Sequence, residues 1–319
     1  MNPVEFLKNV SEKYPDAWQL VERLFLSRGT SLPEWPPYVF FPLAGWYSVT
    51  CHSLGVKRLC LPEIPVMHTL ATFGTWRITQ DIVQFDPDAC EAITKTALDG
   101  TIPADALLQL PSWCLYIVLP DNSTFQGKEV DGVFAFLEHD VKTNSNELRL
   151  SFLHKEEIIH VLLHLGDWGL TDTTIKSHVT LSFDVDTGPK KSIHKSTPAD
   201  IDLKSTINLL LYLCAYGLTF IDASGNESMH GINRPEPQIG KNGRARFFPP
   251  TRPNEHIIGV NIGDGIREAQ EQGTLNSLRK PYWYGEWYGS VKQRPGREAT
   301  PRRFDVHWAP PVGLNPDED

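Results

Sequence analysis

The chain has 319 residues, of which 40% are hydrophobic and 22% charged, a composition that is ordinary for a globular protein and excludes global disorder. The longest apolar run, residues 207–221, is interrupted by Asn208 and Gly217. It is shorter than the roughly 20 residues that span a bilayer, which excludes it as a membrane helix.

The N-terminal region, residues 1–110, is predicted to be mainly helical. Residues 3–28 contain two helical patterns divided at Pro15, and a further helix is expected at residues 88–98. The first positions alternate charged and apolar residues, unlike the uninterrupted apolar core of a secretory signal. We therefore expect the protein to stay in the cytosol, where its five scattered cysteines, which include no Cys-x-x-Cys pair, are reduced and bind no zinc.

The central region, residues 111–222, has the texture of a sheet. Four runs have apolar or alternating character and are separated by turn-rich segments: residues 113–119, 130–138, 147–154 and 158–165. Such runs predict an antiparallel meander of about four strands. Residues 202–216 then read as a core helix.

The C-terminal region, residues 223–319, is basic and aromatic. Residues 1–233 carry 17 Lys and Arg against 28 Asp and Glu, whereas residues 234–303 carry 13 against 7. This asymmetry predicts an anionic partner for the last third, or else a solvated basic loop. Residues 223–256 lack periodicity and are expected to form a long functional loop or a poorly ordered connection. The three regions can also form one domain.

An aromatic stretch at residues 282–289 is the most informative local feature. As a strand, it places Trp283 and Trp287 on one face and its tyrosines on the other. Residues 303–308 alternate in the same way, with Phe304 and Trp308 among the apolar positions. The two runs predict a hairpin, and the fold class is therefore α+β: N-terminal helices, a central antiparallel meander and a C-terminal aromatic hairpin.

Ordered segments over most of the chain carry a resemblance to a known family. They are Phe40-Phe-Pro42, Gly74-x-Trp76-Arg77-x-Thr79 with Gln84 and Asp86, Leu110-Pro-x-Trp-Cys-x-Tyr116, residues 132–135 and 211–214, Arg234-Pro235, Ile262-Gly263, Trp283-x-Gly-x-Trp-x-Gly289 and Phe304-x-Val-x-Trp-x-Pro310. In these segments the chain resembles the type V-A anti-CRISPR inhibitors, which block biogenesis of the RNA-guided effector nuclease.

The resemblance implies a binding protein without catalytic residues or a cofactor. Its partner would be the N-terminal segment of the nascent effector polypeptide, and binding would cause loss of the effector mRNA in the host cell cytoplasm, with the translating ribosome or a host RNase as a further partner. Neither a membrane nor DNA is expected as a partner. Matched residues whose chemistry suits peptide binding are Trp76, Arg77, Arg234, Trp283, Trp287 and Trp308. Core packing is the alternative role for the tryptophans.

Two catalytic or metal-dependent alternatives remain. An RNA-binding protein or RNase acting through the basic third could use His230, His256 or His307, although no spacing unites them. The pair His160 and His164 is a weak metal candidate, because a third ligand is not placed by sequence. A solvent-facing histidine pair is the simpler interpretation.

Overall fold

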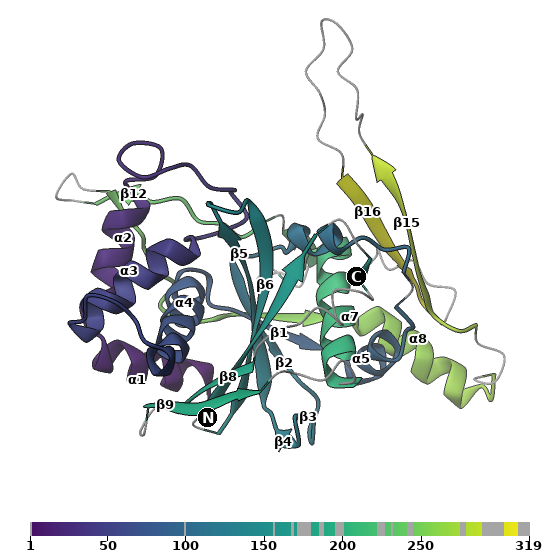
Figure 1. Cartoon of the computed structure of the whole chain (residues 1–319). Coiled ribbons are helices and arrows are strands. Elements are labelled where there is room, and N and C mark those ends of the chain that lie inside the picture. The colour runs from purple at the N-terminus through teal and green to yellow at the C-terminus, as the bar shows by residue number, and fades with distance from the viewer. Residues whose placement is uncertain are drawn as a thin grey trace, which may run out of the picture.

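The computed structural model arranges helices on both sides of a large sheet (Figure 1). It describes residues 2–98, 100–155, 157–166, 169–170, 180–184, 188–194, 201–221, 227–230, 232–240, 245–274, 279–288 and 303–311. Residues 289–302, between the two strands of the predicted hairpin, lie outside these residues.

Helices form the N-terminal part, as predicted, although the third and fourth of them were not individually predicted. They are α1 (Pro3–Lys13), α2 (Ala17–Phe25), α3 (Leu43–Leu54) and α4 (Ile64–Thr79), with a 3-10 turn η1 (Leu61–Glu63) before α4. The predicted division at Pro15 is confirmed, since α1 ends before it and α2 begins after it. At its start, α1 is capped by the side chain of Asn2, which accepts a hydrogen bond from the Val4 amide at 2.9 Å.

The predicted meander is confirmed. Its strands are β2 (Cys114–Val118), β5 (Gly132–Asp140), β6 (Ser145–His154) and β7 (Glu157–Leu165), all paired antiparallel. The sheet continues into β8 (Thr180–Asp184) and β9 (Gly188–His194), and a small side hairpin joins β3 (Thr124–Phe125) to β4 (Lys128–Glu129).

Two parallel strands extend the sheet beyond β2. β1 (Asp81–Phe85) pairs in parallel with β2 on one side and with β14 (Asn254–Ile258) on the other. The complete order is β14-β1-β2-β5-β6-β7-β8-β9, so one sheet takes strands from all three regions of the sequence. The prediction of a loop over residues 223–256 is wrong at its end, where β14 forms, and at residues 227–230, 238–239 and 245–246, which also form strands.

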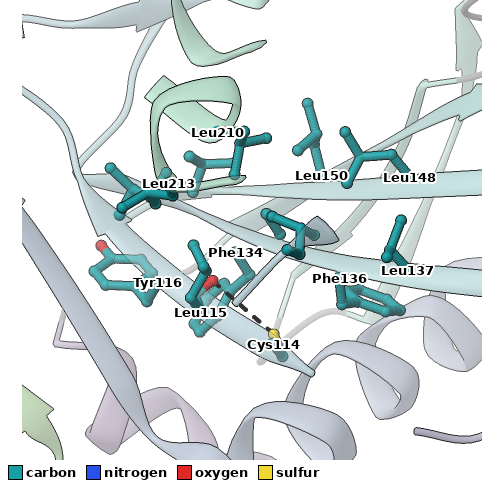
Figure 2. Close-up of a cluster of buried hydrophobic side chains, with 14 of the residues drawn as sticks. Cys114, Leu115, Tyr116, Phe134, Phe136, Leu137, Leu148, Leu150, Leu210 and Leu213 are labelled. Atoms are coloured by element: carbon teal, nitrogen blue, oxygen red, sulfur yellow. Dashed lines mark hydrogen bonds between the residues drawn. The ribbon is translucent and has the colours of Figure 1, made fainter. Parts of the chain in front are cut away.

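Helices cover the opposite face of the sheet from α1–α4 (Figure 1). They are α5 (Pro87–Thr94), the 3-10 helix η2 (Ala104–Gln109), α7 (Ile201–Tyr216) and α8 (Val260–Glu271). Figure 2 shows Leu210 and Leu213 of α7 over the sheet, with Leu115 and Leu150 in the same cluster of buried side chains. No helix in the described ranges combines the length and apolar character needed to cross a membrane.

The predicted C-terminal hairpin is confirmed. Strand β15 (Tyr282–Tyr288) pairs antiparallel with β16 (Arg303–Ala309), and Trp283 lies opposite Trp308. The hairpin is a separate two-stranded sheet that projects from the body (Figure 1). The remaining short strands form two further pairs: β10 (Leu218–Ile221) with β11 (Glu227–His230), and β12 (Gln238–Ile239) with β13 (Ala245–Arg246).

Candidate functional site

Three of the nominated tryptophans lie inside the protein. Trp76, Trp283 and Trp308 are at most 4% exposed. Each indole N–H has a partner: Trp76 donates to the Asp81 carbonyl at 3.0 Å, Trp283 to Asn208 Oδ1 at 2.9 Å and Trp308 to Thr96 Oγ1 at 2.9 Å. Burial with satisfied donors gives these three side chains a role in holding the fold.

The side chain of Arg77 also makes its contacts within the protein. Its guanidinium forms an ion pair with Glu22 at 2.5 Å and lies over the ring of Trp18, 5.7 Å from the centroid. These contacts join α4 to α2 on the face of the sheet that α1–α4 cover. The structure therefore does not bring Arg77 together with the hairpin tryptophans.

The exposed aromatic surface belongs to tyrosines of β15 rather than to its buried tryptophan. Tyr282, Tyr284 and Tyr288 are 50%, 51% and 47% exposed and alternate along the strand; we call them the tyrosine face. Tyr284 stacks on His307 with ring centroids 5.3 Å apart. The Tyr288 hydroxyl donates to Glu286 at 2.6 Å, and this hydrogen bond raises the pKa of the tyrosine.

On the opposite face of the hairpin, Trp287 is the exposed member of the nominated set. It is 43% exposed and packs edge-on against Phe304, with centroids 5.2 Å apart. Gly285 leaves the space that this packing needs, because an added Cβ would lie 2.6 Å from the Phe304 ring. Exposed aromatic rings thus occupy both faces of β15 toward its end.

The two edges of β15 differ in their strand pairing among the described residues. Along one side, β15 pairs with β16 over its whole length. On the other side, the bridges within the described residues are limited to Tyr282, which pairs in parallel with Ala97. A strand edge with few bridges is the kind of edge to which an extended peptide can add.

A hollow lies where β16 begins, next to the end of α7. Its volume is about 580 Å³, and Leu108, Gln109, Leu213, Ala215, Ile232 and Arg234 are among its lining residues. Arg303 of the hairpin also contributes to the lining. We call this cavity the Arg234 hollow. It brings one nominated residue next to the hairpin.

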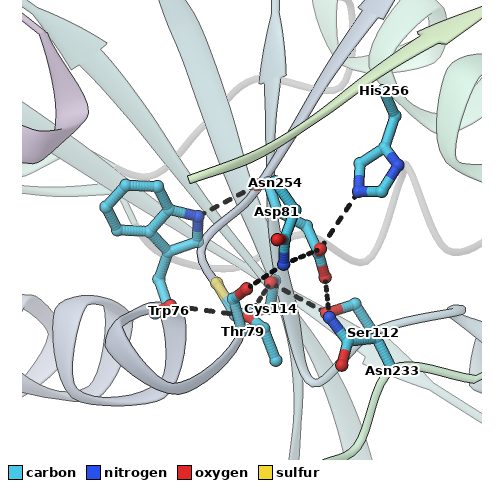
Figure 3. A network of polar contacts seen from close by, with 8 residues as sticks. All are labelled: Trp76, Thr79, Asp81, Ser112, Cys114, Asn233, Asn254 and His256. Carbon is cyan, nitrogen blue, oxygen red and sulfur yellow. Dashed lines mark hydrogen bonds and ion pairs between the residues drawn. The ribbon is translucent and has the colours of Figure 1, made fainter. Parts of the chain in front are cut away.

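A buried polar network fixes the segment that precedes Arg234 (Figure 3). The carboxylate of Asp81 accepts hydrogen bonds from Asn233 at 2.8 Å and Asn254 at 3.3 Å, and lies 3.0 Å from Nε2 of His256. The backbone amide of Asn233 donates to the Pro111 carbonyl at 2.6 Å. Asn233 is thereby held to the sheet, and Arg234 follows directly.

The carboxylate and imidazole in this network do not form an accessible catalytic pair. The side chains of Asp81 and His256 are both 0% exposed, so a substrate cannot reach them. His307 stacks on Tyr284 in the hairpin, and His230 lies in β11. The described contacts do not bring the three histidines together, and the absence of catalytic activity stays a prediction.

The histidine pair of β7 is split between interior and surface. His160 is 2% exposed, and its ring nitrogens lie 2.8 Å from Ser151 Oγ and 3.0 Å from Thr69 Oγ1. Burial lowers its pKa to about 3. His164 instead faces Glu147 at 3.1 Å. The interpretation as a solvent-facing pair is therefore wrong for His160.

In the part of the chain that the structure describes, no three His, Cys, Asp or Glu side chains are grouped to hold a metal ion.

Sequence reasoning did not identify the exposure of the tyrosine face or the Asp81 network, for different reasons. Alternation along β15 correctly placed the tyrosines and the tryptophans on opposite faces of the strand. It did not tell which of the two faces is exposed. The network joins residues up to 175 positions apart, a relationship that a single sequence does not display.

Comparisons with known proteins agree with this architecture. Residues 83–316 match the family model AcrVA2-like, described as the anti-CRISPR type V subtype A2 family. A comparison with curated proteins gives no match. Among solved structures, the crystal structure of AcrVA2 is similar with a TM-score of 0.66 and 19% sequence identity, covering 99% of this chain and 100% of that chain. At so low an identity, the structural likeness shows the fold.

Proposed function

This chain belongs to the AcrVA2-like family of type V subtype A2 anti-CRISPR proteins, and we propose that it acts by binding the N-terminal segment of the type V-A effector during its synthesis. Binding leads to loss of the effector mRNA in the cytoplasm of the host cell. The protein acts as a recognition module in this proposal, and the ribosome or a host RNase supplies the later steps.

The observation that supports peptide binding is the exposed aromatic strand with an edge that has few bridges among the described residues. Tyr284, Trp287 and Tyr288 are each more than 40% exposed on a strand that pairs with β16 along one edge and, among the described residues, forms a bridge on the other edge at Tyr282. An extended peptide adds to such an edge through backbone hydrogen bonds, and aromatic rings select its alternate side chains.

In this proposal the buried aromatic residues hold the hairpin in place, and the exposed ones contact the peptide. Trp283 anchors the hairpin on α7 through Asn208, and Trp308 anchors it on Thr96, which follows α5. The backbone of the strand is therefore already ordered before a peptide binds. Tyrosine and tryptophan are common hot-spot residues, and truncating one costs about 2 kcal/mol or more at a well-packed interface. The loss expected per ring is therefore at least about tenfold in affinity.

Fluorescence anisotropy tests the proposal with a labelled synthetic peptide that copies the effector N-terminus. We expect a Kd of about 1 µM or tighter for the wild-type chain, and weakening by about tenfold or more for Tyr284→Ala and for Trp287→Ala. Phe248→Ala is the matched control, because Phe248 is 50% exposed and lies outside the hairpin. Absence of binding at micromolar peptide concentration contradicts the proposal.

A second peptide separates strand addition from side-chain contact alone. The same sequence with N-methyl groups at alternate residues keeps its side chains but loses backbone donors. Strand addition predicts that methylation on one register abolishes binding while methylation on the other register is tolerated. Equal binding of both methylated peptides contradicts strand addition.

An mRNA measurement in cells distinguishes peptide recognition from RNA recognition. Synonymous recoding of the effector's first codons changes the RNA and keeps the peptide, so the inhibitor should still reduce the mRNA level. Binding of purified protein should also survive RNase treatment and high salt, whereas RNA binding through the basic third would fall steeply with salt. Protection of the recoded message would favour the RNA-binding alternative.

A further inference from the structure

The guanidinium of Arg234 is partly buried, and no carboxylate of the described residues forms an ion pair with it. Its Nη2 donates to the carbonyl of Leu110 at 2.9 Å, and its Nε is buried without a hydrogen-bond partner among the described residues. Within the same residues, no Asp or Glu forms an ion pair with it. Burial lowers its pKa to about 10. A buried cation is unfavourable until an anion compensates it.

The surroundings of Arg234 are largely apolar. Leu108, Leu213, Ala215 and Ile232 line the hollow, and no Asp or Glu is among its described lining residues. The second arginine in the lining, Arg303, differs because its Nε lies 2.8 Å from a carboxylate oxygen of Asp305. Among the described residues, Arg234 is therefore the arginine of the hollow that forms no ion pair.

We propose that the Arg234 hollow binds a carboxylate that is attached to an apolar group. The carboxylate compensates the Arg234 charge, and the apolar group packs against the leucine, alanine and isoleucine side chains. The shared chemistry occurs in an acidic side chain next to an apolar residue of a peptide, and in a free organic acid with an apolar tail. Peptide binding at β15 is not required for this inference.

The polar network makes the site rigid before the ligand arrives. Asn233 is held by Asp81 through its side chain and by Pro111 through its backbone amide, and the Trp113 amide donates to the Asn233 carbonyl at 3.4 Å. These bonds fix the residue next to Arg234. A preorganised cation loses less conformational entropy when a carboxylate binds.

Isothermal titration calorimetry with two probe pairs tests the proposal. Octanoate represents the free acid, and 1-octanol is its uncharged counterpart. The blocked dipeptide acetyl-Leu-Asp-amide represents the peptide source, with acetyl-Leu-Asn-amide as its uncharged counterpart. We expect at least one acid to bind the wild-type chain with a Kd of about 1 mM or tighter, and its uncharged counterpart to bind about tenfold more weakly or worse.

Two variants assign that binding to the hollow. Arg234→Gln should weaken the acid by about tenfold or more and leave the uncharged counterpart unchanged. Ala215→Leu keeps the charge and fills part of the cavity, so it should weaken both members of a pair. Arg246→Gln is the control, because Arg246 lies over Phe248, with 4.5 Å to the ring centroid, outside the hollow. Thermal unfolding checks that each variant is folded.

The outcomes are distinct. Octanoate binding that depends on Arg234 assigns a free acid, and dipeptide binding that depends on Arg234 assigns an acidic peptide. If neither acid binds at millimolar concentration, or if Arg234→Gln and wild type bind the acid equally, the proposal is overturned. Peptide binding by β15 is measured separately with variants of Tyr284 and Trp287, so failure of one proposal does not decide the other.

Discussion

The side-chain amide of Asn233 donates a hydrogen bond of 2.8 Å to Oδ2 of Asp81, a residue 152 positions earlier in the chain. The contact joins the start of β1 to the segment that carries Arg234. Asp81 is completely buried and receives two further contacts, from Asn254 and His256 of β14. A charged carboxylate in this position is tolerable because several polar groups share its solvation.

Replacement of Asn233 by Ala should destabilise the protein. The change removes one donor from a buried carboxylate, and hydrogen bonds to charged groups contribute about 1.5–3 kcal/mol. Urea unfolding followed by tryptophan fluorescence measures the free energy of unfolding. We also expect weaker acid binding in the Arg234 hollow, because the neighbouring residue is no longer fixed.

Gln270→Ala is the control for this measurement. Gln270 is an exposed amide side chain of α8, and surface substitutions usually change stability by about 0.5 kcal/mol or less. If Asn233→Ala is as stable as Gln270→Ala, the hydrogen bond to Asp81 contributes nothing to the fold, and the network loses its assigned role.

Much of the sheet could be predicted because its strands are long and strongly patterned. The meander strands, from β2 to β7, begin and end within a few residues of the predicted runs. By contrast, α4 was missed because nearly all of its residues are buried, so it shows no amphipathic stripe. β1 was missed because it has five residues and includes the polar pair Asp81 and Gln84, which obscures a short strand.

The candidate site could be predicted only in part. Alternation in residues 282–288 and 303–309 predicted both the pairing and the two faces of the hairpin. Exposure was not predictable, because it depends on how α7 packs against Trp283 and Trp308. The Arg234 hollow is assembled from η2, the end of α7 and the start of β16, segments that sequence does not place together.

The two tryptophans of β15 should differ sharply in their effect on stability. Trp283 is 4% exposed and hydrogen-bonded to Asn208, so Trp283→Ala should cost about 3–5 kcal/mol. Trp287 is 43% exposed, and its edge-on contact with Phe304 contributes only about 0.5–1.5 kcal/mol. Equilibrium unfolding of both variants measures the difference. Equal destabilisation would show that Trp287 also belongs to the core, and would remove it from the binding surface.

Glu138 should make stability depend on pH. Its side chain is buried beside Arg149 at 2.7 Å and opposite Glu147, and burial raises its pKa from 4.5 to about 7. The folded state therefore binds more protons than the unfolded state between these pH values, so the contribution of Glu138 to stability falls as pH rises from 4.5 to 7. Above pH 7 this contribution is constant.

Comparison with Glu138→Gln isolates that dependence. The amide does not titrate, so the free energy of unfolding of wild type minus that of the variant should decrease between about pH 5 and pH 7, the range between the two pKa values. Urea unfolding at each pH measures this difference. Arg149, Glu147 and the neighbouring His68 remain in both proteins and largely cancel. A difference that is flat or increases over this range contradicts the raised pKa of Glu138. Glu255→Gln, at an exposed position, should leave the pH profile unchanged.

Gly285→Ala should disturb the exposed end of the hairpin. An alanine Cβ would lie 2.4 Å from the carbonyl oxygen of Asp305 and 2.6 Å from the ring of Phe304. Backbone cannot yield to such a contact without shifting the pairing of β15 and β16, and overpacking of this kind costs about 1–3 kcal/mol. Gly100→Ala is the matched control, since a Cβ there meets nothing within 4 Å. Hydrogen exchange of the hairpin amides measures the effect, and faster exchange confined to β15 and β16 is expected.

Because Phe304 supports Trp287, peptide affinity should fall together with hairpin protection. Unchanged exchange combined with lost peptide binding would instead mean that Gly285 contacts the peptide directly.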